Sequence, residues 1–290
     1  MNYKLLSKRP FRNFRPDYNA QYINLSSSPP IRYLSSTGGV KSQQINTSNR
    51  VILAHDTYGN ISSANHAVFL HGILGSKRNW RTVCNEINKR VLGLHSVSID
   101  HRGHGGSAKM SNGAPPASET VHQCADDIGF LIHNHLNITP SLLCAHSFGG
   151  KVALKYLETQ SKSGSSSSSS NSNSNSSNRR MPSDVWILDS IPGPYSFSNS
   201  SDNTSQSVKT VFQTIADLPS VFESNHWMIA KLLERGIEKG VAQWLATNII
   251  TDPNDPKRKT WEFDINTVNL LFDDFCKLGE LSLFYFFIVP

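Results

Sequence analysis

The sequence predicts an α/β fold, in which a mostly parallel β-sheet carries helices on both faces. Three short apolar runs, at residues 67–70, 97–99 and 142–144, each end in a turn that contains glycine. Continuous apolar runs of this length are typical of strands that are buried on both faces. Helical patterns follow the first and the third turn, and strands that alternate with helices favour a parallel sheet.

The third turn contains a serine in the setting that a nucleophile requires. Ser147 stands at the apex between an apolar strand and a helical pattern, within the segment Ala-His-Ser-Phe-Gly. Such a turn is sharp, so the residues two before and two after the serine must be small. Gly149 meets this requirement, and Ala145 stands where glycine is usual. The alternative is an ordinary strand-to-helix turn that happens to contain serine.

The three turns follow one another in the order of an alpha/beta-hydrolase. Residues 71–76 correspond to the oxyanion loop, residues 100–105 read D-x-R-G-x-G, and the serine turn comes next. The backbone N–H groups of Ile73 and Phe148 are then expected to bind the oxyanion, each lowering the barrier by roughly 3 kcal/mol. The turn at 100–105 is expected to brace the site, and no metal ligand set is expected.

Four motifs resemble the abhydrolase domain-containing protein 11 family: HGILGS, DHRGHGGS, HSFGGKVAL and WILDSIP. The resemblance runs from about residue 51 to about residue 276, with one insert. It implies a serine esterase, and the family also includes mitochondrial esterases and an ethanol acetyltransferase branch. It further implies that the catalytic acid follows the sixth strand, where Asp189 matches. The alternative for Asp189 is a strand-end aspartate that caps the next turn.

The catalytic base has no counterpart at the expected place. In this fold the histidine follows the acid in the chain, and the only histidine after Ser147 is His226, inside the expected cap. The side chain of His146 is expected to point away from the serine, and His71 is expected to be structural. We interpret the apolar residues 281–289 as the start of a seventh strand, and the sequence as a C-terminally truncated hydrolase with impaired activity.

The expected domain organisation follows from composition. Residues 1–45 form a targeting segment, and residues 46–290 form the hydrolase domain with a flexible Ser/Asn-rich insert at 161–180 and a helical cap at 195–276. Residues 1–41 carry seven basic side chains and one acidic, which accounts for the net charge of +6. This composition is typical of a mitochondrial transit peptide. The alternative is a disordered basic tail on a cytoplasmic protein.

The functional expectation is a hydrolase of carboxylic esters, including acyl or lipid esters, that forms an acyl-enzyme on Ser147. Transfer of the acyl group to an alcohol is a variant of the same chemistry. The alternative is a non-catalytic binding protein, because the histidine region is missing. No cofactor, nucleic acid or transmembrane segment is expected, and the oligomeric state is not predicted. In the helix expected at 118–136, Glu119, Asp126 and Asp127 are expected to be solvated.

Overall fold

The structure is a computed structural model that describes residues 52–108, 119–164, 181–190, 193–194 and 203–279. Side chains are described for these ranges except at 162–164 and 203–207. The predicted targeting segment, most of the Ser/Asn-rich insert and the apolar C-terminal run lie outside these ranges, and the interpretations given for them stay predictions.

The main sheet has five strands in the order β1-β3-β2-β4-β5. The edge strand β1 is antiparallel to β3, and the other neighbours are parallel. The mostly parallel sheet is therefore confirmed, and the three apolar runs lie within β2, β3 and β4. The strands are β1 (His55–Gly59), β2 (Asn65–Leu70), β3 (Leu94–Ile99), β4 (Leu142–His146) and β5 (Asp184–Leu188).

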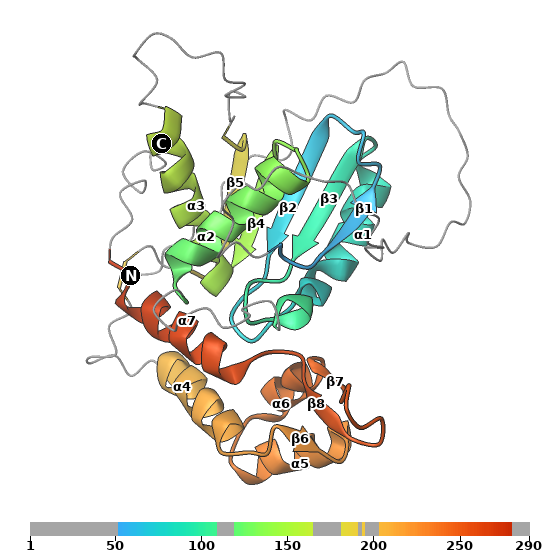
Figure 1. Cartoon of the computed structure of the whole chain (residues 1–290), viewed down its shortest axis with the longest axis vertical. Coiled ribbons are helices and arrows are strands. Elements are labelled where there is room, and N and C mark those ends of the chain that lie inside the picture. Colours follow the sequence, from blue (N-terminus) through green and yellow to red (C-terminus); the bar gives the residue numbers. More distant parts are fainter. Residues whose placement is uncertain (1–51, 109–118, 165–180, 191–192, 195–202, 280–290) are drawn as a thin grey trace.

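Helices cover both faces of this sheet, as predicted (Figure 1). Alternate residues of β2 point to opposite faces, because side chains alternate along a strand. Ala67 and Phe69 pack on the face of α1, and Val68 and Leu70 pack on the face of α2 and α3. The helical elements are the 3-10 helix η1 (Lys77–Trp80), α1 (Arg81–Arg90), α2 (Val121–Phe130), the π-helical η4 (Leu131–His135) and α3 (Phe148–Gly164).

The predicted helical cap contains a small sheet as well as helices. Three short strands pair antiparallel in the order β6-β8-β7. Strands of two or three residues are too short to show an alternating pattern, so the sequence predicted only helices here. The elements are α4 (Asn203–Ala216), β6 (Val221–Phe222), α5 (Asn225–Glu234), α6 (Lys239–Ala246), β7 (Ile249–Thr251), β8 (Lys259–Trp261) and α7 (Ile265–Lys277).

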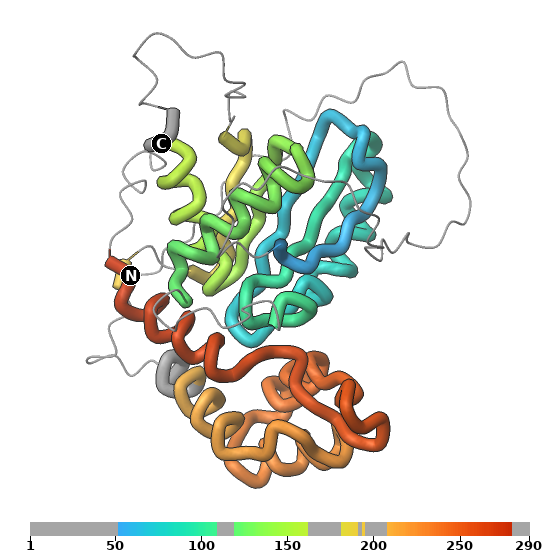
Figure 2. Tube along the Cα trace, viewed as in Figure 1, coloured from blue at the N-terminus to red at the C-terminus, as the bar shows by residue number. Residues whose placement is uncertain are grey.

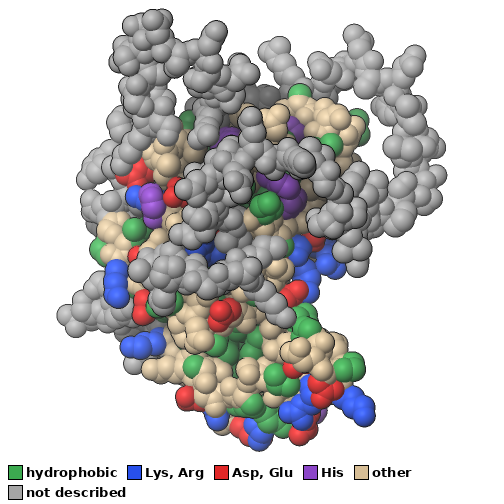
Figure 3. All heavy atoms as spheres, viewed as in Figure 1, with side chains coloured by type: hydrophobic (Ala, Val, Ile, Leu, Met, Phe, Trp, Pro, Cys, Tyr) green, Lys and Arg blue, Asp and Glu red, His purple; other side chains and the backbone are tan. Residues whose placement is uncertain are grey.

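Helix α7 joins the cap to the main domain. It runs along the junction between the two, with α4 beside it (Figures 1 and 2). Val268 packs in the core of the cap, whereas Leu271 and Phe275 pack in the core of the main domain. On the face shown in Figure 3, the cap shows apolar side chains beside charged side chains of both signs. None of the described helices combines the length and hydropathy that crossing a membrane requires.

The prediction that Glu119 and Asp127 are solvated is wrong. Both carboxylates are buried against the guanidinium of Arg102, whose Nε lies 2.7 Å from Asp127 Oδ2 and whose Nη1 lies 3.3 Å from Glu119 Oε2. Burial raises the pKa of Asp127 to about 6, although Arg102 acts to lower it. Of the three acidic residues expected to be solvated, Asp126 alone keeps a substantially exposed carboxylate. The helix pattern does not show that an arginine from a distant turn covers this face.

Removing Arg102 tests this network. We expect Arg102→Met to destabilise the protein by about 3–5 kcal/mol, because it leaves two buried carboxylates without their cation. The control is Lys89→Met, which removes an exposed pair with Glu86 and should cost less than about 1 kcal/mol. Urea unfolding at pH 7 measures both. Equal losses in the two variants would contradict the assignment of Arg102 as a structural centre.

Candidate active site

Ser147 occupies the strained apex of the turn between β4 and α3. Its φ is 50°, in the left-handed region that residues other than glycine rarely adopt. The turn is fixed on both sides: the N–H of Ser147 donates to the carbonyl of Leu188 at 2.8 Å, and the N–H of Gly150 donates to the carbonyl of Ser147 at 2.8 Å. The surrounding backbone therefore holds the serine in a backbone conformation that is unfavourable for a residue other than glycine.

Three glycines let other segments approach this turn. A Cβ on Gly149 would lie 2.6 Å from the carbonyl oxygen of His71, and a Cβ on Gly150 would lie 2.6 Å from the Cβ of Ser190. A Cβ on Gly72 would lie 3.3 Å from the Cβ of Ser147. The loop after β2 and the end of β5 thus both pack directly on the serine turn.

The loop at residues 71–76 is held in a fixed shape beside Ser147. Leu74 has a φ of 58°. Its N–H donates to Nε2 of His104 at 3.1 Å, and its carbonyl accepts from the side chain of Asn248 in the cap at 2.8 Å. By contrast, the N–H groups of Ile73 and Phe148 donate to no other residue of the described chain. The first N–H groups of a helix have no acceptor within it, so that of Phe148 is available to a ligand.

Three buried histidines, His71, His101 and His104, each form a hydrogen bond between the ring and a backbone carbonyl. Nδ1 of His71 donates to the carbonyl of Gly72 at 2.8 Å, and its Nε2 accepts from the N–H of His101 at 3.1 Å. Nδ1 of His104 donates to the carbonyl of Arg102 at 2.9 Å. Burial lowers the pKa of His71 to about 4 and that of His104 to about 3. These rings are neutral at pH 7 and connect the two loops.

Asp100 braces the same wall from the end of β3. Its carboxylate accepts from the N–H of Lys77 at 2.6 Å, from Nζ of Lys77 at 2.9 Å and from the N–H of Gly106 at 2.9 Å. A Cβ on Gly105, in the 3-10 helix η2 (Gly105–Ser107), would lie 2.4 Å from this carboxylate. These contacts support the structural role expected for the D-x-R-G-x-G turn.

Asp189 lies at the end of β5, the strand next to β4, with a φ of 51°. Its side chain is 90% exposed, and its Oδ2 lies 3.9 Å from Nε2 of His146. The sequence did not predict this proximity of His146 to Asp189. His226 lies on α5 in the cap and is exposed. Within the described residues, no histidine forms a hydrogen bond with the hydroxyl of Ser147.

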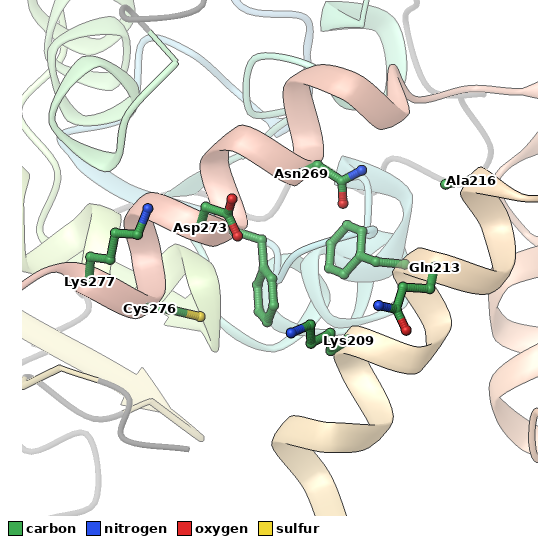
Figure 4. A pocket seen from close by; sticks show the side chains of 9 residues that line it. Lys209, Gln213, Ala216, Asn269, Asp273, Cys276 and Lys277 are labelled. Carbon is green, nitrogen blue, oxygen red and sulfur yellow. The ribbon is translucent and has the colours of Figure 1, made fainter. Parts of the chain in front are cut away.

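A cavity of about 430 Å³ opens between α4 and α7 (Figure 4). The rings of Phe212 and Phe272 stack there with their centroids 4.8 Å apart. Its lining includes neither Ser147 nor Ile73 nor Phe148. The other lining residues are Lys209, Gln213, Ala216, Asn269, Asp273, Cys276 and Lys277.

The sequence matches the alpha/beta hydrolase fold family over residues 65–251. That range covers more than half of the chain, so the protein belongs to the alpha/beta hydrolase fold family. Among solved structures, it resembles an esterase from a marine microorganism, with a TM-score of 0.60 and 17% identity over 80% of this chain and 77% of the other. At this identity the likeness confirms the fold.

Among characterised proteins, the chain is similar to sn-1-specific diacylglycerol lipase ABHD11. It is 32% identical to the Danio rerio protein over 115 residues, which cover 39% of this chain and 33% of the relative. It is 34% identical to the Mus musculus protein over 87 residues, covering 30% of this chain and 26% of the relative. The chain thus spans about a third of the length of the curated relatives it matches.

A pair of glycine substitutions tests the packing of the serine turn. We expect Gly149→Ala to destabilise the protein by about 1–3 kcal/mol or more, because the new methyl group would meet backbone oxygens. The matched control is Gly129→Ala in α2, where the added Cβ would lie 3.6 Å from the nearest side-chain atom. That substitution should stabilise the protein by up to about 1 kcal/mol. Thermal unfolding of both variants measures the difference, and a neutral Gly149→Ala would contradict the packing described.

The buried histidines predict a loss of stability in mild acid. His71 and His104 have pKa values lowered to about 4 and about 3, whereas an unfolded histidine titrates near 6.5. As the pH falls below 6.5 the unfolded state gains protons that the native state does not, so stability decreases, by roughly 2 kcal/mol for each histidine at pH 5. Asp127, with its raised pKa, offsets part of this loss between pH 6 and 4.

Urea unfolding at pH 7 and pH 5 measures this loss. The exposed His226 provides the control. His226→Gln changes no buried ring, so it should leave the difference in unfolding free energy between pH 7 and pH 5 unchanged. A protein as stable at pH 5 as at pH 7 would contradict the neutral state of the buried rings.

Proposed function

We propose that this protein is a serine hydrolase of carboxylic esters that acts through an acyl-enzyme on Ser147. The observation that carries the proposal is the serine turn itself. A serine held at a left-handed φ of 50°, at the start of a helix and against a glycine-rich loop, matches the requirements of a nucleophile elbow. The esterase and lipase relatives described above support the same class of reaction.

The proposed chemistry has two steps on one serine. In the first step, Oγ of Ser147 attacks the ester carbonyl carbon, the bond to the alcohol breaks, and the alcohol leaves with the proton taken from the serine. In the second step, water attacks the acyl-enzyme and releases the acid. An alcohol in place of water would give acyl transfer. In both steps the N–H groups of Ile73 and Phe148 would stabilise the oxyanion.

Asp189 is the proposed acid of this mechanism. It ends the strand next to the one that leads to Ser147, and it would orient the base that takes the serine proton. The described residues place no histidine on the hydroxyl of Ser147, so the proposal concerns two members of a triad. As substrates we propose acyl or lipid esters, because the relatives with the matching motifs are named diacylglycerol lipases.

A specific observation favours a second candidate, a non-catalytic binding protein with a hydrolase fold. The carboxylate of Asp189 is 90% exposed and has His146 at 3.9 Å, an arrangement that does not activate Ser147. A hydrolase without its base loses several orders of magnitude in rate. Such a protein would bind an ester between the cap and the sheet without turning it over.

Covalent labelling of Ser147 separates the two candidates. We expect an active-serine phosphonate probe to label the protein once, at Ser147, and Ser147→Ala to abolish labelling and to lower hydrolysis of p-nitrophenyl butyrate by at least about 10³-fold. The control is Ser183→Ala, at an exposed serine just before β5, which should retain both. Mass spectrometry locates the label. Turnover that survives in Ser147→Ala would refute the proposed nucleophile, and ester binding without labelling or turnover would favour the binding protein.

A further inference from the structure

Lys151 is a fully buried lysine that the proposed mechanism does not use. It belongs to α3, one helical turn after Ser147, and its exposed fraction is 0%. Lysine is almost never fully buried unless its charge has a partner. Among the described residues it forms no salt bridge, and burial lowers its pKa. A buried ammonium without a salt bridge needs another source of stabilisation.

The end of α7 supplies that stabilisation. Nζ of Lys151 donates to the backbone carbonyl of Phe275 at 2.6 Å and lies 4.2 Å from the centroid of the Phe275 ring. The last four carbonyls of a helix lack intrahelical donors and carry its negative dipole end, which favours a cation. The N–H of Leu278 donates to the carbonyl of Asp274 at 2.9 Å, and Lys151 donates to the next carbonyl, that of Phe275. Lys151 therefore caps α7 from a neighbouring helix.

A second contact holds the same turn of α7. The carboxylate of Asp274 accepts from the backbone N–H of Val121, the first residue of α2, at 2.8 Å. The other end of α7 is held by the D-x-R-G-x-G turn, where the N–H of Asp264 donates to the carbonyl of Gly103 at 2.8 Å. The helix that joins the cap to the main domain is thus fastened at both ends by polar contacts.

We infer that Lys151 is a positioning residue. Its contact with Phe275, called the latch below, holds the C-terminal end of α7 against α3, the helix that follows Ser147. Ser147 and Lys151 flank the same first turn of α3, so this contact fixes α7 relative to the nucleophile. Cys276 and Lys277, which follow Phe275, line the cavity between α4 and α7, so the latch also sets one wall of that cavity. The link to catalysis rests on the proposed function, whereas the latch itself does not.

Cys276 provides a reporter for the latch. It is partly buried, whereas the other three cysteines are buried. We expect Lys151→Met, which keeps the apolar stem but removes the donor, to increase the rate of Cys276 alkylation by a water-soluble maleimide at least tenfold. Lys151→Arg keeps the charge and the donors and should bring the rate back towards that of the wild type. Mass spectrometry resolves the four thiols.

The matched control is Lys155→Met, one turn further along α3. Nζ of Lys155 pairs with Glu158 of its own helix at 2.9 Å, so its removal should leave the alkylation rate unchanged. An unchanged rate of Cys276 alkylation in a folded Lys151→Met variant would overturn the latch. A tenfold increase would also overturn it if Lys155→Met showed the same increase, or if Lys151→Arg did not reduce it.

If Lys151→Met does not fold, Cys84, Cys124 and Cys144 will be alkylated as well. In that case, amide hydrogen exchange on the unmodified protein tests the inference. The latch predicts that the last turn of α7, residues 274–278, exchanges no faster than residues 268–272. A last turn that frays would overturn it.

The phosphonate probe then tests the link to catalysis. If the wild type is labelled at Ser147, Lys151→Met should be labelled at least tenfold more slowly, and Lys155→Met at the wild-type rate. Equal labelling would overturn the link to catalysis. An unlabelled wild type would count against the proposed function, while the Cys276 rates would still decide the latch.

Discussion

The arrangement of this protein depends on a steric constraint at the turn that carries Ser147. The start of α3 can lie against the loop after β2 only because Gly149 has no side chain, since a Cβ there would reach the carbonyl oxygen of His71 at 2.6 Å. The same absence of side chains at Gly72 and Gly150 admits the loop and the end of β5. With these contacts in place the serine has no room to relax from its left-handed conformation. The strain at the site is thus maintained by close packing on several sides.

Around this turn the wall of the site is built from buried polar side chains that bond to backbone groups or to one another. Three buried histidines, one aspartate and one arginine fasten the loop at 71–76, the turn at 100–105 and α2 to one another. Each of these side chains has at least one hydrogen-bond partner, as most buried polar groups do, although Nδ1 of His101 has none among the described residues. Such contacts contribute directional specificity that apolar packing lacks, because an imidazole with fixed donors and acceptors fits only one loop geometry. The shape of the loop at Ile73 follows from this framework.

Helix α7 extends the framework to the cap. It contributes Val268 to the core of the cap and Leu271 and Phe275 to the core of the main domain. Its last turn is held by Lys151 and by the N-terminus of α2. A cap that shares a helix with the main core is positioned by that core. This coupling relates the first turn of α3 to the cavity beside α4.

The sequence by itself determined strands β2 to β5 of the main sheet, their parallel arrangement and the position of Ser147. These features depend on local patterns: apolar runs, glycine turns and the order of the turns along the chain. It also placed Ile73, Phe148 and Asp189 at strand ends, where parallel strands bring side chains to one edge. Only the tertiary structure decided that Glu119 and Asp127 are buried, that Lys151 reaches Phe275, that His146 lies near Asp189 and that the cap contains a sheet. Each of these depends on a partner far away in the chain, and a charged residue has the same local pattern whether water or a distant side chain covers it.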